Sequence, residues 1–92
     1  MTLTLDTVIV ASRDQNSTDL ADEVVILHLK NGTYFGLNAV GAHIWKLIQK
    51  PTTIRAICES VQQEYSVEQA QCEADTLKLI ADLVAQELAE TA

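Results

Sequence analysis

The first forty residues alternate between apolar and polar positions with a period of two, which is the spacing of β-strands that bury one face. The β-branched run Val8–Ala11 predicts a first strand, and residues 23–30 and 33–37 predict two more. Residues 12–22 hold Ser, Asn, Thr and four charged side chains with little periodicity, so we expect a loop there. The chain is therefore predicted to open with three strands.

The dipeptide Asn31-Gly32 separates the second and third predicted strands and is typical of a two-residue type I′ hairpin turn. Such a turn pairs Leu29 with Tyr34 and Leu27 with Gly36, and it assigns the more apolar face of the hairpin to the core. That predicted core face consists of Val25, Leu27, Leu29 and Tyr34. The opposite face is predicted to be a mixed surface of His28, Lys30, Thr33 and Phe35.

After residue 37 the apolar spacing becomes helical. Asn38 is a good N-cap for a short helix that Lys50-Pro51 ends. Thr52 or Thr53 caps a second predicted helix, whose apolar stripe is Ile54, Ile57, Cys58, Val61 and Tyr65. Ser66 with Gln69 predicts a capping box for a third helix, which runs from residue 67 to about residue 89.

The third predicted helix carries two apolar stripes. The first is assigned to the core and consists of Ala70, Ala74, Leu77, Ile80 or Ala81, Val84 and Leu88. The second lies beside it and consists of Cys72, Thr76, Leu79 and Leu83. Because one apolar face is enough to pack a helix onto a domain, the second stripe either widens the buried face or lines a groove. The sequence leaves both alternatives open.

The order of three strands followed by three helices predicts an α+β fold. Its layout is that of a winged helix-turn-helix: a three-stranded antiparallel sheet, then three α-helices. A chain of 92 residues supports one compact core, so we predict a single domain over residues 1–92 with a core from about residue 7 to residue 89.

Composition and charge narrow the classes of partner. Hydrophobic residues make up 48% of the chain and aromatic residues 4%, which indicates a globular protein with an aliphatic core. Thirteen acidic residues against six basic ones give a net charge of −7. An acidic surface repels phosphates and anionic lipids, so we expect neither nucleic acid nor membrane as a partner. The N-terminal residues lack the basic start and apolar stretch of a signal peptide, which favours a cytoplasmic location.

Few residues could carry catalytic chemistry. His28 and His43 have no carboxylate at a useful spacing, so each is interpreted as a solvated or packed histidine. Cys58 and Cys72 lie outside any Cys-x-x-Cys pattern, and the three glycines are isolated. We therefore expect no catalytic residue, no metal, no cofactor and no disulfide. The sequence favours a protein that binds rather than one that catalyses.

The stretch from Gly32 to Trp45 resembles the strand-to-helix signature of the PqqD-like family: a turn glycine, an aromatic strand, Leu-Asn, then Gly-x-x-Ile-Trp. The chain downstream also fits, and the match runs from about residue 23 to residue 88. The downstream matches are Ile54, Ile57-Cys58, Glu64-Tyr65-Ser66-Val67, Cys72-Glu73, Leu77, Leu79-Ile80 and Leu83. One departure is that the family often has Gly-Leu after the long helix, where this chain has Glu87-Leu88. Glutamate favours continuation of the helix, so we expect a longer C-terminal helix.

The resemblance implies a function. PqqD-like proteins are precursor-peptide recognition elements, non-catalytic adaptors that bind the leader of a ribosomally made precursor peptide and deliver it to a modifying enzyme. Residues 64–67 and Cys72-Glu73 are most similar to stand-alone members of lasso-peptide pathways, whose partner is a leader peptidase. Three alternatives remain: a PqqD-type chaperone that serves a radical enzyme in the synthesis of coenzyme PQQ or another modified peptide, a DNA-binding winged helix, and a subunit or inhibitor of an enzyme.

The predicted peptide site combines a strand edge with a helix. The strand at residues 33–37 follows a hairpin and contains neither proline nor lysine, so it can offer an open edge to an added peptide strand. Alternatively, the first strand or the segment after Ser12 covers that edge. On the third helix Leu79 and Leu83 would form the floor of a groove, and Asp75 and Asp82 its rim. The candidate peptide-binding residues are Thr33, Tyr34, Phe35, Gly36, Leu37, Cys72, Asp75, Thr76, Leu79, Asp82 and Leu83.

Overall fold

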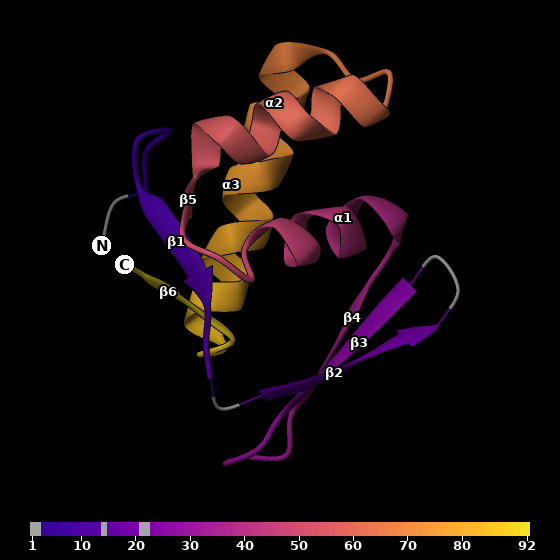
Figure 1. The fold of residues 1–92 in the computed structure, drawn as a ribbon, viewed down its shortest axis with the longest axis vertical. Coiled ribbons are helices and arrows are strands. Elements are labelled where there is room, and N and C mark those ends of the chain that lie inside the picture. Colours follow the sequence, from indigo (N-terminus) through magenta and orange to yellow (C-terminus); the bar gives the residue numbers. More distant parts are fainter. Residues whose placement is uncertain (1–2, 14, 21–22) are drawn as a thin grey trace.

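The computed structural model describes residues 3–13, 15–20 and 23–92. Its elements in chain order are β1 (Val8–Ala11), β2 (Gln15–Leu20), β3 (Glu23–His28), β4 (Tyr34–Leu37), α1 (Ala39–Leu47), β5 (Thr52–Thr53), α2 (Ile54–Glu64), α3 (Gln69–Ala85) and β6 (Ala89–Thr91). The predicted α+β fold is confirmed, because an antiparallel three-stranded sheet precedes three helices (Figure 1). The described residues also form further strands that we did not predict.

The strands form two small antiparallel sheets. One sheet has the order β2-β3-β4 and projects from the helices as a wing (Figure 1). The other has the order β5-β1-β6 and joins segments that are distant in sequence, since Val8 pairs with Thr53 and Val10 pairs with Glu90. The first predicted strand, β1, is therefore confirmed as a strand, but it belongs to this second sheet.

The loop predicted for residues 12–22 was wrong, because β2 lies within it and pairs with β3 along its whole length. There is a physical reason why the sequence pattern did not reveal β2. Side chains 16–18 of β2 are exposed on both faces of the strand. A stretch that is exposed on both faces has no need of alternating apolar residues, so hydrophobic periodicity does not reveal it.

The predicted hairpin register was also wrong. Leu27 pairs with Tyr34 and Val25 with Gly36. The His28 N–H donates to the carbonyl of Thr33 at 2.9 Å, so the turn contains the four residues 29–32. Gly32 has a φ of 70°, whereas Asn31 is not among the residues with positive φ, and a type I′ turn requires positive φ at both positions.

The core face of the hairpin is the one that we assigned to the surface. Val24, Ile26 and His28 are buried, as is Leu37 on the partner strand. Tyr34, on the predicted core face, is 71% exposed, and Leu29, in the turn, is 54% exposed. Because β3 ends at His28, Leu29 adds nothing to the outer face, and the inner face becomes the more apolar one.

The helix starts of α1 and α2 agree with the sequence. The Asn38 side chain accepts a hydrogen bond from the Gly41 N–H at 2.9 Å, and the Thr53 hydroxyl accepts one from the Ala56 N–H at 3.1 Å. The buried residues of α2 fall on the predicted stripe. At Gly41 an added Cβ would lie 3.2 Å from the Leu37 Cβ, so glycine lets the first turn of α1 pack closely against the end of β4.

The predicted face and bounds of the third helix were wrong. α3 begins at Gln69 after Glu68, which makes no side-chain cap, so the capping box at Ser66 does not form. Its buried residues are Cys72, Thr76, Ile80 and Leu83, which are largely the second stripe. In the stripe assigned to the core, Ala70, Ala74 and Ala81 are exposed, and Leu77 and Val84 are half-buried. The inner face of the β2-β3-β4 sheet and all three helices share one core.

The C-terminal end of α3 is a Schellman motif. The Leu88 N–H donates to the Leu83 carbonyl at 2.8 Å, and the Glu87 N–H donates to the Val84 carbonyl at 3.0 Å. Glu87 has a φ of 60°, the left-handed conformation that this motif requires. The expectation that Glu87 prolongs the helix was therefore wrong, because the chain turns there and enters β6.

Candidate functional site

Strand β4 lies at the edge of the β2-β3-β4 sheet. The alternative in which β1 or the segment after Ser12 covers this edge is wrong for the described residues. β2 pairs with β3 on the opposite side of the sheet, and β1 pairs with β5 and β6. The predicted open edge is therefore present.

The hydrogen-bond pattern of β3 and β4 determines which groups the open edge offers. In an antiparallel pair, residues alternate between those that direct their N–H and C=O groups to the partner and those that direct them away. Because the His28 N–H bonds to the Thr33 carbonyl, Phe35 and Leu37 also direct their groups to β3. Tyr34 and Gly36 are left with their N–H and C=O groups pointing to the open edge.

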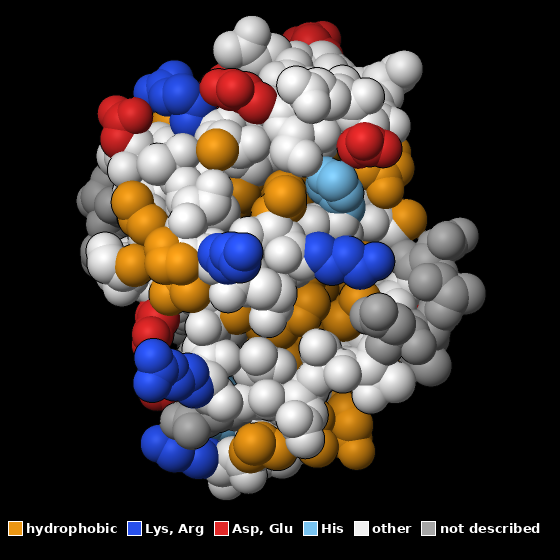
Figure 2. All heavy atoms as spheres, viewed as in Figure 1, with side chains coloured by type: hydrophobic (Ala, Val, Ile, Leu, Met, Phe, Trp, Pro, Cys, Tyr) orange, Lys and Arg blue, Asp and Glu red, His pale blue; other side chains and the backbone are white. Residues whose placement is uncertain are grey.

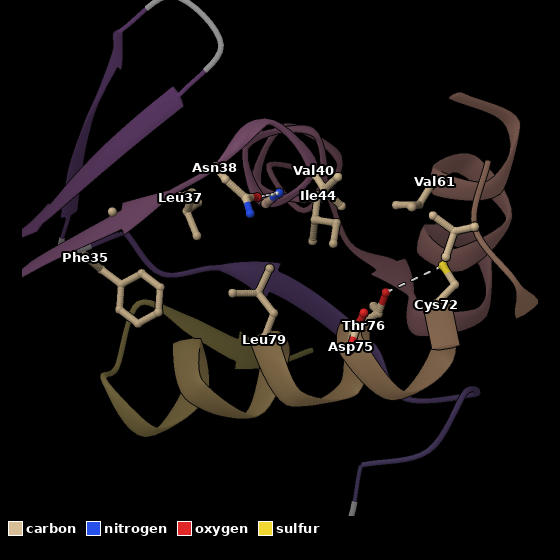
Figure 3. A pocket seen from close by; sticks show the side chains of 13 residues that line it. Phe35, Leu37, Asn38, Val40, Ile44, Val61, Cys72, Asp75, Thr76 and Leu79 are labelled. Carbon is tan, nitrogen blue, oxygen red and sulfur yellow. Dashed lines mark hydrogen bonds between the residues drawn. The ribbon is translucent and has the colours of Figure 1, made fainter. Parts of the chain in front are cut away.

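A groove of about 380 Å³ runs beside this edge, between β4, α1 and α3 (Figure 3). β4 contributes Phe35 and Leu37 to its lining, the residues whose side chains point inward. Apolar side chains of the helices continue the lining: Val40 and Ile44 of α1, Val61 of α2 and Leu79 of α3, with Val67 before α3. The groove is thus a mainly apolar surface that adjoins unpaired backbone groups.

One wall of the groove is polar. Figure 3 shows Asp75, Thr76 and Cys72 following Leu79 along α3. The Thr76 hydroxyl and the Cys72 thiol lie 4.0 Å apart, and both residues are 2% exposed. The Cys72 thiol also donates to the Cys58 carbonyl at 3.7 Å. The carboxylate of Asp75 accepts a hydrogen bond from the side-chain amide of Gln71 at 2.8 Å.

Comparison with known proteins supports the resemblance. Residues 23–89 match the family described as coenzyme PQQ synthesis protein D (PqqD). The chain belongs to the PqqD family. This confirms the resemblance seen in the sequence, over nearly the same residues.

A solved structure is also similar to this PqqD-family protein, namely "TbiB1 in Complex with the TbiA(beta) Leader Peptide". The two chains are 40% identical, with a TM-score of 0.82 over 88% of this chain and 94% of TbiB1. The comparison with curated protein sequences gave no significant match.

The structure of this PqqD-family protein brings together most of the predicted site residues. Those that line the groove are Phe35, Gly36, Leu37, Cys72, Asp75, Thr76 and Leu79. Four others lie elsewhere. Thr33 lies between the turn and β4 and does not line the groove, and Tyr34 is on the outer face of the sheet. Asp82 is exposed on α3 beyond the groove, so it does not form the predicted rim. Leu83 is fully buried in the core, so it cannot form the groove floor.

The wall that α1 provides was not predicted from the sequence. Asn38, Val40, Gly41 and Ile44 all line the groove. A signal was present, since Asn38 caps a helix that begins directly after β4, so the first turn of that helix must lie close to the end of the strand. Val61 and Val67 had no comparable signal, because their place in the groove depends on the packing of α2 and α3.

The histidines and cysteines of the PqqD-family chain are packed in the structure. His28 is 2% exposed, and its Nδ1 accepts a hydrogen bond from the Lys30 N–H at 3.2 Å. The Nε2 of His43 lies 2.9 Å from the Ser60 hydroxyl, which ties α1 to α2. Cys58 and Cys72 are buried free thiols, and burial raises the pKa of Cys58. Residues 3–13, 15–20 and 23–92 contain no group of three possible ligands that could hold a metal ion.

Two surface properties bear on the class of partner. On the face shown in Figure 2, basic side chains lie apart from one another rather than in one continuous patch. α3 carries three acidic residues, Glu73, Asp75 and Asp82, and one basic residue, Lys78. A helix of this charge is unsuited to a phosphate backbone. Within the part of the chain that the structure describes, no helix is long and apolar enough to cross a membrane.

Proposed function

We propose that this protein binds the leader segment of a ribosomally made precursor peptide, by strand addition to β4, and presents the peptide to a modifying enzyme. The open edge of β4 beside an apolar groove carries the proposal. TbiB1, which is 40% identical to this chain, is described in complex with a leader peptide, and this supports it.

The geometry favours a definite arrangement of the bound strand. Its backbone would pair with the N–H and C=O groups of Tyr34 and Gly36. Directly opposite residues of paired strands share a face of the sheet. Leader side chains opposite Phe35 and Leu37 therefore enter the groove toward Leu79, and the alternate leader side chains face solvent. Backbone pairing supplies affinity, and the groove supplies specificity.

The partner enzyme that we propose is a leader peptidase of a lasso-peptide pathway. The support is the similarity of residues 64–67 and Cys72-Glu73 to the stand-alone proteins of such pathways. A chaperone for a radical enzyme is the alternative within the same family. In either pathway we propose a non-catalytic role for this chain, which holds the leader while the enzyme acts on it.

The binding mode is tested by two edge prolines. Gly36→Pro removes an N–H that points away from β3, and an added Cβ at Gly36 meets no atom within 4 Å, so the fold should tolerate the change. Ser17→Pro is the matched control, because in the β2-β3 register the Ser17 N–H points to the opposite edge of the same sheet. We expect Gly36→Pro to abolish leader binding and Ser17→Pro to preserve it.

Fluorescence anisotropy measures the binding. The probes are the TbiA(beta) leader peptide and the leader of any short precursor encoded beside this gene. For the wild type we expect a Kd near micromolar or below, about −8 kcal/mol. Equal binding by wild type and Gly36→Pro would exclude the β4 edge as the site.

The adaptor role is tested with the partner. We expect mass spectrometry to find the leader peptide intact after incubation with this protein alone. Addition of this protein should accelerate cleavage by a peptidase encoded nearby, for a precursor that carries its leader and not for one without it. Cleavage of the peptide by this protein alone would refute the adaptor role.

A further inference from the structure

The groove beside β4 differs in chemistry along its length. Figure 3 shows Phe35, Leu79 and Asp75 following one another, so the lining passes from apolar side chains to a carboxylate. We propose that the groove selects leaders in which a lysine or arginine lies two residues from an aliphatic anchor, and that Asp75 is the residue that determines this selection. The inference rests on the function proposed above.

The spacing follows from the geometry of helix and strand. Leu79 and Asp75 are four residues apart on α3, which is a rise of about 6 Å along the helix axis. Side chains on one face of a strand recur every second residue, about 6.6 Å apart. A strand beside α3 that places an aliphatic side chain against Leu79 therefore brings the side chain two residues away close to Asp75.

The polar wall of the groove lacks a strong donor. Asp75 makes no ion pair among the described residues, and its polar partner there is the neutral amide of Gln71. The neighbouring Thr76 hydroxyl is 2% exposed, and its polar neighbours are the thiols of Cys72 and Cys58, which are weak partners. An ammonium or guanidinium group brings several donors and no acceptor, so it complements the Asp75 carboxylate.

The same arrangement disfavours acidic leaders. An acidic side chain at this position would lie against the Asp75 carboxylate beside apolar walls, where repulsion is stronger than in open water. The net charge of −7 also attracts cationic peptides from a distance. Asp82 provides a comparison, because it has the same charge on the same helix and lies outside the groove lining.

The test is an unbiased selection of peptides. A displayed library of random twelve-residue peptides is selected on immobilised wild-type protein and on the variants D75K and D82K. Gly36→Pro, which blocks strand addition to β4, is the control for binding at the open edge. We expect wild type to enrich Lys or Arg two residues from an aliphatic residue. D75K should enrich Asp or Glu at that position, and D82K should select the same peptides as wild type.

Titration of the best wild-type peptide gives the size of the effect. Replacement of its basic residue by glutamate should weaken binding about tenfold, and D75N about fivefold, the upper end for a partly exposed ion pair. Circular dichroism checks that the variants fold. Because Asp75 is exposed, D75N should keep its fold even if D75K does not, and it should lose the preference for basic peptides.

The outcomes separate the two proposals. If wild type enriches aliphatic residues without any charge preference, the inference about Asp75 is overturned and leader binding stands. If D82K changes the preference as much as D75K does, the electrostatic field of the whole protein rather than Asp75 selects the peptide. The inference is then again overturned. If the selected peptides bind Gly36→Pro as well as wild type, strand addition itself fails.

Discussion

Glu87 is held in a conformation that an L-residue with a side chain seldom adopts. Its φ of 60° lets the Leu88 N–H reach the Leu83 carbonyl, and both of these leucines are fully buried. The left-handed conformation costs a non-glycine residue roughly 1 kcal/mol or more. The backbone hydrogen bond between Leu83 and Leu88 and the burial of both leucine side chains offset this cost.

Glu87→Gly should therefore stabilise the protein. We expect the free energy of unfolding to rise by about 1 kcal/mol, because glycine adopts positive φ without a steric penalty. Urea denaturation measures the change. Glu87→Ala, which keeps a Cβ, is the control and should give no such gain. Equal stability of the Gly and Ala variants would mean that backbone strain at this residue is negligible.

Cys58 should make the stability of the fold depend on alkaline pH. Burial raises the pKa of its thiol above the ordinary value of 9.0, so the folded state retains the neutral form where the unfolded state ionises. A raised pKa stabilises the folded state. This contribution is fully present below pH 9.0 and is lost as the pH rises toward the folded-state pKa.

We therefore expect the free energy of unfolding, measured with urea, to fall as the pH rises from 9 to 11. In Cys58→Ala the fall should be shallower, although the variant is less stable at every pH. Tyrosine and lysine titrations are common to both proteins and cancel in the comparison. Parallel curves for the two proteins would contradict the prediction.

At the scale of elements, one apolar stripe of α3 serves both the core and the groove. The centre of the stripe is buried in the core, and its edge lines the groove. Leu83 is fully buried, whereas Leu79 is half-buried in the groove lining. Leu79→Asp should keep the fold and weaken leader binding by about 2 kcal/mol or more, because it places a charge against the bound peptide. Leu83→Asp should unfold the protein. Circular dichroism and anisotropy separate the effects, and loss of fold in Leu79→Asp would place that residue in the core.

Strand β4 should show an alternating pattern of amide exchange. The amides of Phe35 and Leu37 bond to β3 and should exchange slowly with or without peptide. Those of Tyr34 and Gly36 point to the open edge, so they should exchange quickly in the free protein and become protected when a leader binds. Hydrogen exchange followed by NMR gives this result residue by residue. Protection of β2 amides instead would show that the peptide adds to the other edge.

The sequence predicted those features that depend on neighbours along the chain. Asn38 and Thr53 cap helices through their own side chains, and the stripe of α2 follows from one helical period. These are local arrangements that need no knowledge of the partner.

Other features depend on what packs against an element, and the sequence could not determine them. Both faces of the β3–β4 hairpin and both stripes of α3 are apolar enough to be buried, so the choice between them rests with the rest of the fold. The same ambiguity moved Leu83 from the predicted groove into the core.

For the whole molecule, a leader in the groove would contact several elements of the fold at once. The groove takes its lining from the wing strand β4 and from all three helices (Figure 1, Figure 3). Binding to the folded state alone should stabilise it by about 2.7 kcal/mol at a peptide concentration one hundred times the Kd.

Differential scanning fluorimetry should therefore show a rise in Tm with peptide for wild type and Ser17→Pro. Gly36→Pro should show no rise. A rise in Gly36→Pro equal to that of wild type would exclude the β4 edge as the binding site.

The shortness of the open edge of β4 determines how the protein behaves in a mixture of unrelated peptides. Any extended chain can reach the N–H and C=O groups of Tyr34 and Gly36, yet these four groups supply only about 1 kcal/mol each in net terms. Ordering the incoming backbone costs about 1–2 kcal/mol for each residue fixed. A strand without side chains for the groove therefore gains nothing and dissociates. Occupancy of the β4 edge therefore depends on the side chains that a peptide places against Phe35, Leu37 and Leu79.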